Sequence, residues 1–185
     1  MLQDISLKKL IMENLFLLSA IKRLTYYKEL GDKTFAQLSE ADFHFTPAEE
    51  CNSIAFIIQH MHGNMLSRWT DFLTSDGEKD WRKRDAEFEE QSVNKKQLLL
   101  LWEEGWKCFF DAVESLSDSD LEKTVYIRTR PLSVIDAINR QLAHYPYHVG
   151  QIIYSAKIIR NKNWQNLSVP KGRSSEYTDE LKRQP

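Results

Sequence analysis

Two histidines four residues apart are the residues of this sequence best placed to do metal chemistry. His144 and His148 form an HxxxH pair within a segment whose apolar residues repeat at helical spacing. In a helix, side chains four positions apart point within about 40° of each other, so the two imidazoles can hold one ion. Two histidines at the rim of a helix interface show the same spacing. The pair alone therefore leaves both interpretations open.

The residues around the pair favour the metal interpretation. On a helical wheel, His144 and His148 share one flank of the apolar stripe with Ala137 and Gln141. A metal site needs such a border, because it must be packed enough to fix the rings and open enough to admit a substrate. Gln141 could orient a ligand through a hydrogen bond. Pro146 lies between the histidines and removes one backbone hydrogen bond, which predicts a local kink.

A third ligand has to come from another helix, and two histidines compete for the role. His60 and His62 are two residues apart, about 200° around a helix, so both cannot face one ion. The wheel slightly favours His62, which lies nearer the apolar stripe. His60 shares a small, polar flank with Asn64, and this flank matches that of the histidine pair. Periodicity does not decide between them. His44, which precedes Pro47, is expected in an exposed loop.

Other reactive side chains give weaker signals. The sequence shows neither a Ser-His-Asp nor a Cys-His signature for nucleophilic catalysis. Cys51 and Cys108 do not form a CxxC, and two cysteines are no disulfide framework, which fits a reducing cytoplasm. Arg68 could meet a carboxylate of a substrate. The alternative is an ion pair with Asp71 or Glu78.

Four long segments with helical periodicity must position these side chains. They are predicted over about Leu7–Leu30, Asn52–Gly77, Asn94–Leu116 and Ser133–Arg160. The apolar stripe of the first consists of Leu7, Leu10, Ile11, Leu15, Leu18, Ile21 and Leu24. Strand signals are nearly absent, so an all-α four-helix bundle is the expected fold.

Capping residues and helix-terminating glycines indicate where these helices begin and end. Gly31 is expected to end the first helix. Asn52 or Ser53 can cap the second, and Ser75-Asp76-Gly77 is expected to end it. Between the second and third helices, Glu78–Glu90 is charged but carries two large aromatic residues, which predicts an ordered, long crossing loop.

The two remaining segments lack helical periodicity. Thr124–Thr129 is expected to be irregular or extended. The residues after Arg160 are polar and include Pro170 and Gly172, which predicts an extended C-terminal tail. We therefore expect a helical bundle domain over residues 1–171 and a polar tail over 172–185.

Composition narrows the classes of function. The chain has 185 residues, typical of one domain, with 25 basic and 27 acidic side chains and a net charge of -2. A nucleic-acid-binding protein usually has a basic excess, so nucleic acid is not an expected partner. The longest apolar runs, such as Ile54–Ile58, are far too short to span a membrane. Met1–Lys9 shows no signal-peptide pattern, so a cytoplasmic protein is expected.

Several motifs, taken in order along the chain, resemble the DinB-like superfamily of bacterial four-helix-bundle metalloproteins, and most closely a subfamily of unknown function. The likeness covers roughly Leu7 to Lys171. The residues that carry it are Ser53-Ile54 to His60, Gly63-Asn64-Met65-Leu66-Ser67-Arg68-Trp69, Phe72-Leu73, Asp76-Gly77-Glu78-Lys79, Arg82 to Phe88, Arg140-Gln141-Leu142-Ala143-His144 and His148-Val149-Gly150-Gln151-Ile152.

The resemblance implies a metal site and a partner. That family has one histidine early in the second long helix and an HxxxH in the last, which here are His60, His144 and His148. It implies three imidazoles plus water around one divalent ion, zinc or nickel, and a homodimer. Pro146 within the HxxxH departs from the general pattern. Characterised members include S-transferases and isomerases that use bacillithiol, mycothiol or glutathione.

Three functions follow as hypotheses. The first is a metal-dependent transferase acting on a small-molecule thiol, since three histidines leave an open position on the ion. The second is a non-catalytic metal-binding or stress-response protein. The third is a bundle whose histidines bind nothing. The Asp76–Glu90 loop should discriminate: Arg82, Arg84 and Asp85 turned toward the ion favour catalysis, whereas pairing among themselves favours binding alone.

Overall fold

The computed structural model of the protein describes residues 2–88 and 93–183, with side chains described from Leu15 onward. The described chain is mostly helical and contains one small two-stranded sheet. Among the described residues, no helix is both long and apolar enough to cross a membrane. The elements in chain order are α1 (Leu2–Phe35), η1 (Ala41–Phe43), α2 (Ile54–Trp69), η2 (Asp85–Phe88), α3 (Lys95–Glu114), η3 (Asp118–Asp120), β1 (Thr124–Ile127), β2 (Arg130–Ser133), α4 (Val134–Arg160), η4 (Asn161–Asn163) and α5 (Ser174–Arg183).

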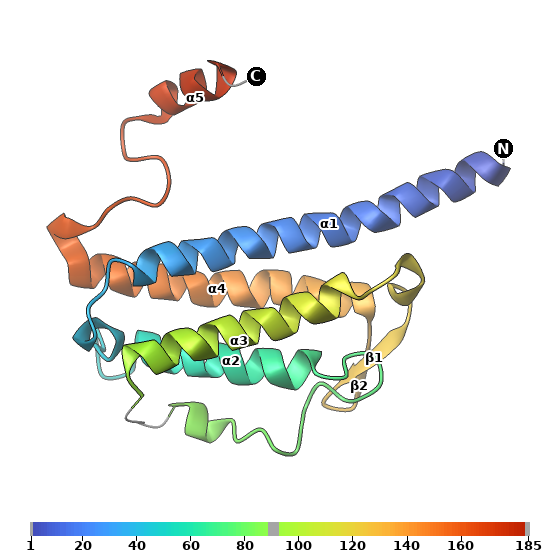
Figure 1. The fold of residues 1–185 in the computed structure, drawn as a ribbon, viewed down its shortest axis with the longest axis horizontal. Helices are drawn as coiled ribbons and strands as arrows, with labels where there is room; N and C mark the ends of the chain where they lie inside the picture. Colours follow the sequence, from blue (N-terminus) through green and yellow to red (C-terminus); the bar gives the residue numbers. More distant parts are fainter. Residues whose placement is uncertain (1, 89–92, 184–185) are drawn as a thin grey trace.

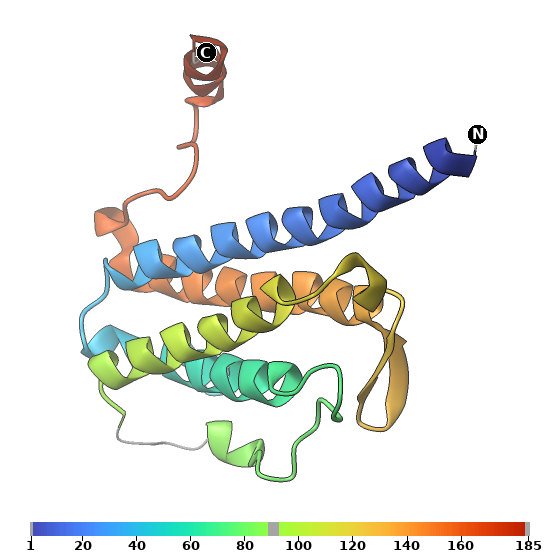
Figure 2. The ribbon, with the colours of Figure 1, turned by 45° about the vertical axis from the view of Figure 1, so that its right-hand side comes forward.

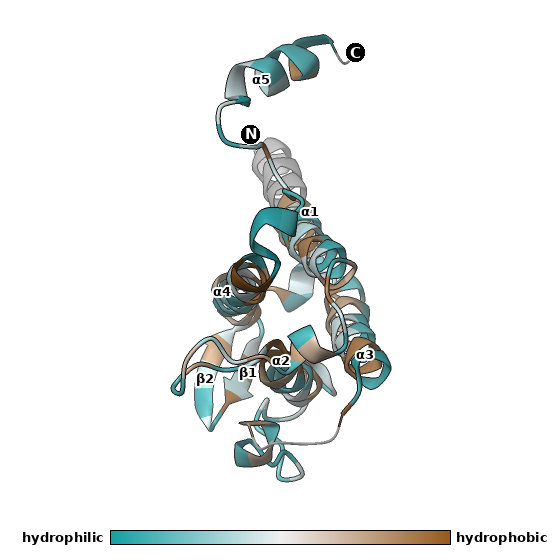
Figure 3. Cartoon of the chain, turned by 90° about the vertical axis from the view of Figure 1, so that its left-hand side faces the viewer, coloured by the Kyte–Doolittle hydropathy of each residue, from teal (hydrophilic) through white to brown (hydrophobic). Residues whose placement is uncertain are grey.

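Helices α1 to α4 share one hydrophobic core. Helix α1 packs against α4 and α2 packs against α3, with further contacts between α1 and α3 and between α2 and α4. Figures 1 and 2 show the four helices side by side, and Figure 3 looks along them. Each contributes fully buried side chains, among them Leu24 of α1, Ile58 of α2, Trp106 of α3 and Ile152 of α4. The predicted apolar periodicity therefore reflects mutual burial of four helices.

Caps define where three of these helices begin. The Ser53 hydroxyl accepts a hydrogen bond from the Phe56 N–H at 3.2 Å, so Ser53 rather than Asn52 caps α2. Asn94 and Gln97 form a capping box at the start of α3, and Ser133 caps α4. Each cap satisfies a backbone N–H that has no partner within its helix. The predicted starts of these helices are confirmed.

The predicted end of α1 at Gly31 is wrong. The helix continues through Gly31 to Phe35. A β-carbon at position 31 would lie 2.4 Å from Cζ2 of Trp102, so the glycine gives the α3 indole room against the α1 backbone. Helix α2 also ends earlier than predicted, at Trp69. Thr70 is extended and Asp71 has a φ of 51°, so the chain leaves the helix before Ser75.

Residues 124–133, which follow η3, form a β-hairpin. The sequence predicted only an irregular or extended stretch over Thr124–Thr129. Strands β1 and β2 pair antiparallel around a two-residue turn, Arg128-Thr129, whose φ angles are 55° and 63°. Such a turn fits the twist of the strands but is strained for residues other than glycine. The Asp76 carboxylate accepts hydrogen bonds from both turn N–H groups, at 2.9 and 2.7 Å. This loop residue therefore fastens the hairpin to the end of α2.

The extended tail predicted after Arg160 is also wrong for Ser174–Arg183, which form α5. Ion pairs three residues apart, Arg173–Glu176 and Lys182–Asp179, connect successive turns at its two ends. Figures 1 and 2 show α5 standing apart from the other helices, and none of its residues is buried.

The crossing loop lies beside α2, and η2 contacts that helix. Its two large aromatic residues, Trp81 and Phe88, are 56% and 38% exposed. Glu87 is buried instead. Glu89 and Glu90, which the prediction included, lie outside the described residues.

Candidate metal centre

Helices α2 and α4 bring three histidines together. His60 comes from the middle of α2, and His144 and His148 from consecutive turns of α4. One ring nitrogen from each lies within 4.8 Å of the others, and the Nε2 atoms of His144 and His148 are 3.0 Å apart. The His60 ring centroid is 5.7 Å from that of His144 and 4.9 Å from that of His148. The group could therefore hold a metal ion.

All three rings are oriented in the same way: Nδ1 points away from the centre of the cluster, toward an oxygen acceptor, and Nε2 points toward the centre. Nδ1 of His60 lies 3.0 Å from Oε2 of Glu87. Nδ1 of His144 lies 3.2 Å from Oε1 of Gln141, and Nδ1 of His148 lies 2.8 Å from Oε1 of Gln151. These oxygens accept hydrogen bonds, so each Nδ1 carries the hydrogen and each Nε2 keeps its lone pair. Oxygen acceptors behind Nδ1 are the arrangement found around metal-binding histidines.

This orientation creates an electrostatic requirement at the centre. Two neutral Nε2 atoms at 3.0 Å present lone pairs to each other, and such a contact is repulsive unless a proton or a cation lies between them. Two nitrogens bound to one tetrahedral zinc lie about 3.4 Å apart, given Zn–N bonds of about 2.0–2.1 Å. The spacing of the α4 pair is close to this value. The three histidines therefore have the nitrogen donors and the spacing that a divalent cation requires.

Burial keeps the α4 pair in the form that binds metals. Burial, together with the nearby His148, His60 and Arg140, lowers the pKa of His144 to about 3. Burial also lowers the pKa of His148 to about 4, against a hydrogen bond to Gln151 that acts in the opposite direction. Both rings are therefore neutral near pH 7. Neutral imidazole is the form that ligates a metal.

The third ring is held from the crossing loop. Glu87 contacts His60 on one side, while Arg82 donates to both oxygens of the same carboxylate at 2.7 and 2.9 Å. Burial raises the pKa of Glu87, but hydrogen bonds from His60 and Arg82 outweigh it and leave the pKa lowered. The carboxylate is thus ionised. Phe88 covers the His60 ring, with the centroids 5.1 Å apart.

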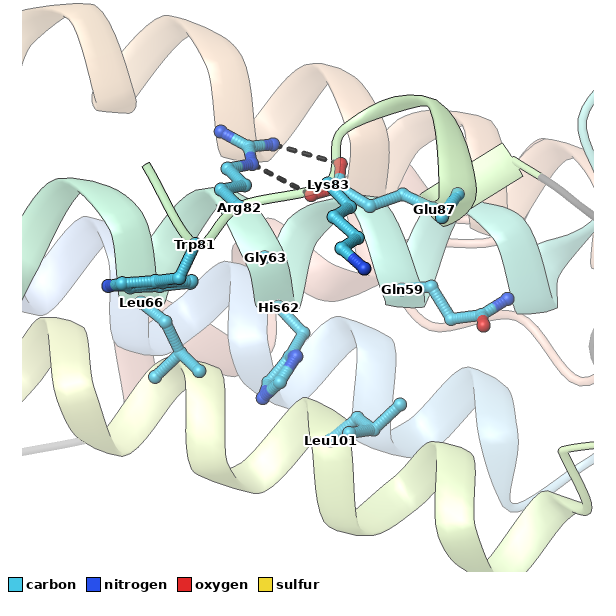
Figure 4. Close-up of a pocket in the computed structure, with 10 residues that line it drawn as sticks. Gln59, His62, Gly63, Leu66, Trp81, Arg82, Lys83, Glu87 and Leu101 are labelled. Atoms are coloured by element: carbon cyan, nitrogen blue, oxygen red, sulfur yellow. Dashed lines mark hydrogen bonds and ion pairs between the residues drawn. The ribbon is translucent and has the colours of Figure 1, made fainter. Parts of the chain in front are cut away.

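The competing histidines lie elsewhere. His62 faces α3, where its Nε2 is 3.0 Å from Oε2 of Glu104, and Figure 4 shows it on the α3 side of α2 near Leu101. His44 is exposed, as expected. The helical-wheel preference for His62 does not hold in the structure, because α2 packs against α3 as well as α4. The side of α2 that carries His62 faces α3, and the polar flank that carries His60 faces α4.

Three residues support the site from the interior. The Tyr145 hydroxyl is fully buried; it accepts a hydrogen bond from Trp69 at 2.9 Å and donates to Asn64 at 3.3 Å. Burial raises the pKa of Tyr145, so it remains a neutral donor. This network ties α2 to α4 through the residue adjacent to His144. It holds the two helices in the register that brings the histidines together.

Two of the arginines named in the sequence hypotheses, Arg68 and Arg82, form ion pairs within the chain. Arg68 is buried; its guanidinium donates to the Gly77 carbonyl and contacts Glu78 at 3.2 Å. Burial lowers the pKa of Arg68. The predicted ion pair with Glu78 is confirmed. Arg82 faces Glu87, whereas Arg84 and Asp85 are exposed. The loop therefore reaches the cluster through Glu87, a residue outside the two predicted alternatives.

Two residues of the site were missed by sequence reasoning. Gln151 is three residues after His148, just as the predicted Gln141 is three before His144, so helical spacing could have revealed it. Glu87 is 27 residues from His60, and its contact carries no periodic signal.

A search of curated proteins found no match, and neither did a search of solved structures. Residues 12–173 match the family model described as "Protein of unknown function (DUF1572)". This match includes all three histidines of the cluster and Glu87. The chain belongs to this family of proteins of unknown function, DUF1572.

Proposed function

We propose that the protein binds one divalent ion, zinc or nickel, through Nε2 of His60, His144 and His148, in a four-helix bundle of the DinB-like type. The observation that carries the proposal is the shared orientation of the rings, each with Nδ1 against an oxygen acceptor. Three neutral nitrogen ligands with an open fourth position are typical of catalytic rather than structural zinc.

The proposed chemistry is conjugation of a low-molecular-weight thiol, such as bacillithiol, to an electrophilic carbon. A bound divalent ion supplies the charge that makes a thiol or a water molecule acidic near neutral pH. The S–C bond forms as the bond between that carbon and its leaving group breaks, the leaving group takes the electron pair of the broken bond, and the thiol proton passes to water. Gln141, Gln151 and Glu87 fix the rings during this chemistry. Burial raises the pKa of Cys108, so this half-buried side chain stays a thiol and is no competing nucleophile.

Metal binding without turnover is the second candidate, and one observation favours it. Arg68 and Arg82 each form an ion pair within the chain, with Glu78 and Glu87 respectively. Each guanidinium charge is therefore already paired without a substrate anion. A stress-response or metal-storage role would need only the histidine cluster.

Metal analysis of protein purified without an affinity tag tests the proposal. We expect about one divalent ion per chain, lost in His144→Ala and His60→Ala. His44→Ala and His62→Ala are the matched controls, because these rings lie outside the cluster, and they should retain the ion. Equal metal content in all four variants would refute the assignment.

Thiol chemistry is tested separately with a cobalt-substituted site. We expect small thiols to change the cobalt absorption spectrum of the wild type. Metal-dependent loss of free thiol with an electrophile should follow, and His148→Ala should abolish it. An unchanged cobalt spectrum over a panel of thiols would leave metal binding without thiol chemistry as the function.

We also propose a cytoplasmic homodimer. Leu15 and Leu18 belong to the predicted apolar stripe of α1 but are 56% and 57% exposed, and Figures 1 and 2 show the N-terminal part of α1 extending past the other helices. On α4, Tyr154 and Ile158 are 69% and 46% exposed. A second copy could cover these residues. Sedimentation should give twice the chain mass, and Tyr154→Glu with Leu18→Glu should give monomers.

A further inference from the structure

We propose that the crossing loop is a latch on the metal site, in which Glu87 is a positioning residue that couples the ion to the Arg82–Phe88 segment through His60. This inference rests on the proposed metal binding. It assigns the loop a function of its own: the segment should tighten on α2 when the ion is bound, and the ion should bind more weakly when the segment is detached.

The contacts of the latch form one continuous chain from loop to cluster. Arg82 makes a two-point contact with Glu87, and Glu87 contacts His60. The three side chains are only 2%, 10% and 6% exposed, respectively. Ionic hydrogen bonds in such buried places are geometrically specific and costly to break on one side. Glu87 therefore fixes both which nitrogen of His60 carries the hydrogen and where the ring points.

Helix α2 is shaped to receive this carboxylate. A β-carbon at Gly63 would lie 2.1 Å from Oε1 of Glu87 and 3.6 Å from Nε of Arg82. Figure 4 shows Arg82 and Glu87 meeting over Gly63, with dashed lines between them. Because Glu87 is held from both sides, its carboxylate cannot move away without losing a partner. The glycine thus admits the latch to the helix surface.

Apolar packing explains only part of how the segment is held. Phe88 covers the His60 ring but is still 38% exposed, and the adjacent Trp81 is 56% exposed. Beneath the segment lies a hollow of about 270 Å³, lined in part by Gly63, Leu66 and Leu101. The buried carboxylate of Glu87 contacts His60 of α2, and Arg82 holds that carboxylate from the other side. A segment with few buried apolar contacts can open separately from the core, so its buried ionic contacts decide how readily it opens.

The coupling should be reciprocal. If a closed latch raises metal affinity by some factor, the ion must favour the closed latch by the same factor. Removing an outer hydrogen-bond partner of a metal-bound histidine commonly lowers affinity about 10- to 100-fold. We therefore expect a loss in this range when Glu87 is neutralised.

The test compares Glu87→Gln with Glu104→Gln. Both variants remove a carboxylate that lies 3.0 Å from a histidine of α2, but Glu104 faces His62, outside the cluster. Zinc affinity is measured by competition with a chromogenic chelator. The cobalt spectrum reports the ligand field, and hydrogen exchange of peptides covering residues 79–88 reports the latch. Each is measured with and without metal.

Gly63→Ala is the second variant, because Glu87→Gln leaves the buried Arg82 without its charge partner. Alanine favours helix over glycine, so the backbone of α2 itself should stay intact in this variant. The latch predicts weaker metal binding, since the new methyl group displaces Glu87.

The expected result is a 10- to 100-fold loss of zinc affinity and an altered cobalt spectrum in Glu87→Gln and Gly63→Ala, with Glu104→Gln like the wild type. Metal should slow exchange of residues 79–88 in the wild type but not in Glu87→Gln. Wild-type affinity, spectrum and loop protection in both site variants would overturn the latch alone. A wild type that binds no ion would overturn the proposed function, and the latch with it.

Discussion

Acidifying the metal-free protein from pH 7 to pH 5 should destabilise it, because the fold holds His144 and His148 neutral. Their folded pKa values are lowered to about 3 and about 4 by burial, against an unfolded value of about 6.5. As the pH falls below about 6.5, the unfolded chain takes up protons that the native chain cannot. The stability is therefore complete above this pH and is lost between about 6.5 and 4.

The size of the loss follows from the same values. One histidine that protonates only in the unfolded state lowers the free energy of unfolding by up to about 2 kcal/mol between pH 7 and pH 5. Both rings are only half-buried, so water screens part of the effect. For the pair we expect a total loss of about 2 kcal/mol. Carboxylates with a lowered pKa, such as Glu87 and Glu78, contribute only at lower pH, because their unfolded pKa is about 4.3.

Urea unfolding in the presence of a chelator measures this difference. The wild type is compared at pH 7 and pH 5 with a His144→Gln/His148→Gln double variant, whose side chains do not titrate. His44→Gln serves as a control for removing an exposed histidine. The double variant should lose most of the pH dependence, and the control should keep it. If the wild type and the double variant lost equal stability on acidification, the reasoning from buried neutral rings would be wrong.

Three further predictions concern the ion and the packing. Chelation should leave helical circular dichroism intact, because the core shared by α1–α4 folds without the ion; saturation at 100 times Kd should add about 2.7 kcal/mol to the free energy of unfolding, and loss of most helicity would contradict this. Metal affinity, measured by competition, should fall below about pH 6.5, since protonated imidazole cannot ligate; constant affinity from pH 5 to 8 would exclude histidine ligands. Gly31→Ala should cost about 1–3 kcal/mol in urea unfolding, because the methyl group meets Trp102 at 2.4 Å; unchanged stability would show that the helices adjust freely.

Helix positions were predictable wherever local rules act alone. The caps at Ser53, Asn94 and Ser133 lie at the helix starts, because a side chain three residues from a free N–H satisfies it without help from the rest of the fold. Gly31 misled for the opposite reason. Its backbone freedom suggests a helix end, but the indole of Trp102 on another helix decides its use.

The hairpin turn and the loop required tertiary information. Arg128 and Thr129 carry no sequence signal for a left-handed turn; Asp76, far away in the chain, supplies the hydrogen bonds that stabilise it. Trp81 and Phe88 are the large aromatic residues of this loop, yet the side chains of Arg82 and Glu87 are the more deeply buried. Residue type indicates how favourable the burial of a side chain is, but it does not indicate which residue of the fold that side chain will contact.

For the candidate site, the sequence by itself determined the pairing of His144 with His148, because four residues along one helix place two side chains on one face whatever surrounds it. It left His60 and His62 as alternatives from the residues alone. The family resemblance pointed to His60, and the tertiary structure gives the physical reason: α4 covers one flank of α2 and α3 the other, and a helical wheel does not show which helix lies beside which flank. Only the tertiary structure decided the place of Glu87, which meets His60 because Gly63 leaves room on α2 and Arg82 holds the carboxylate there.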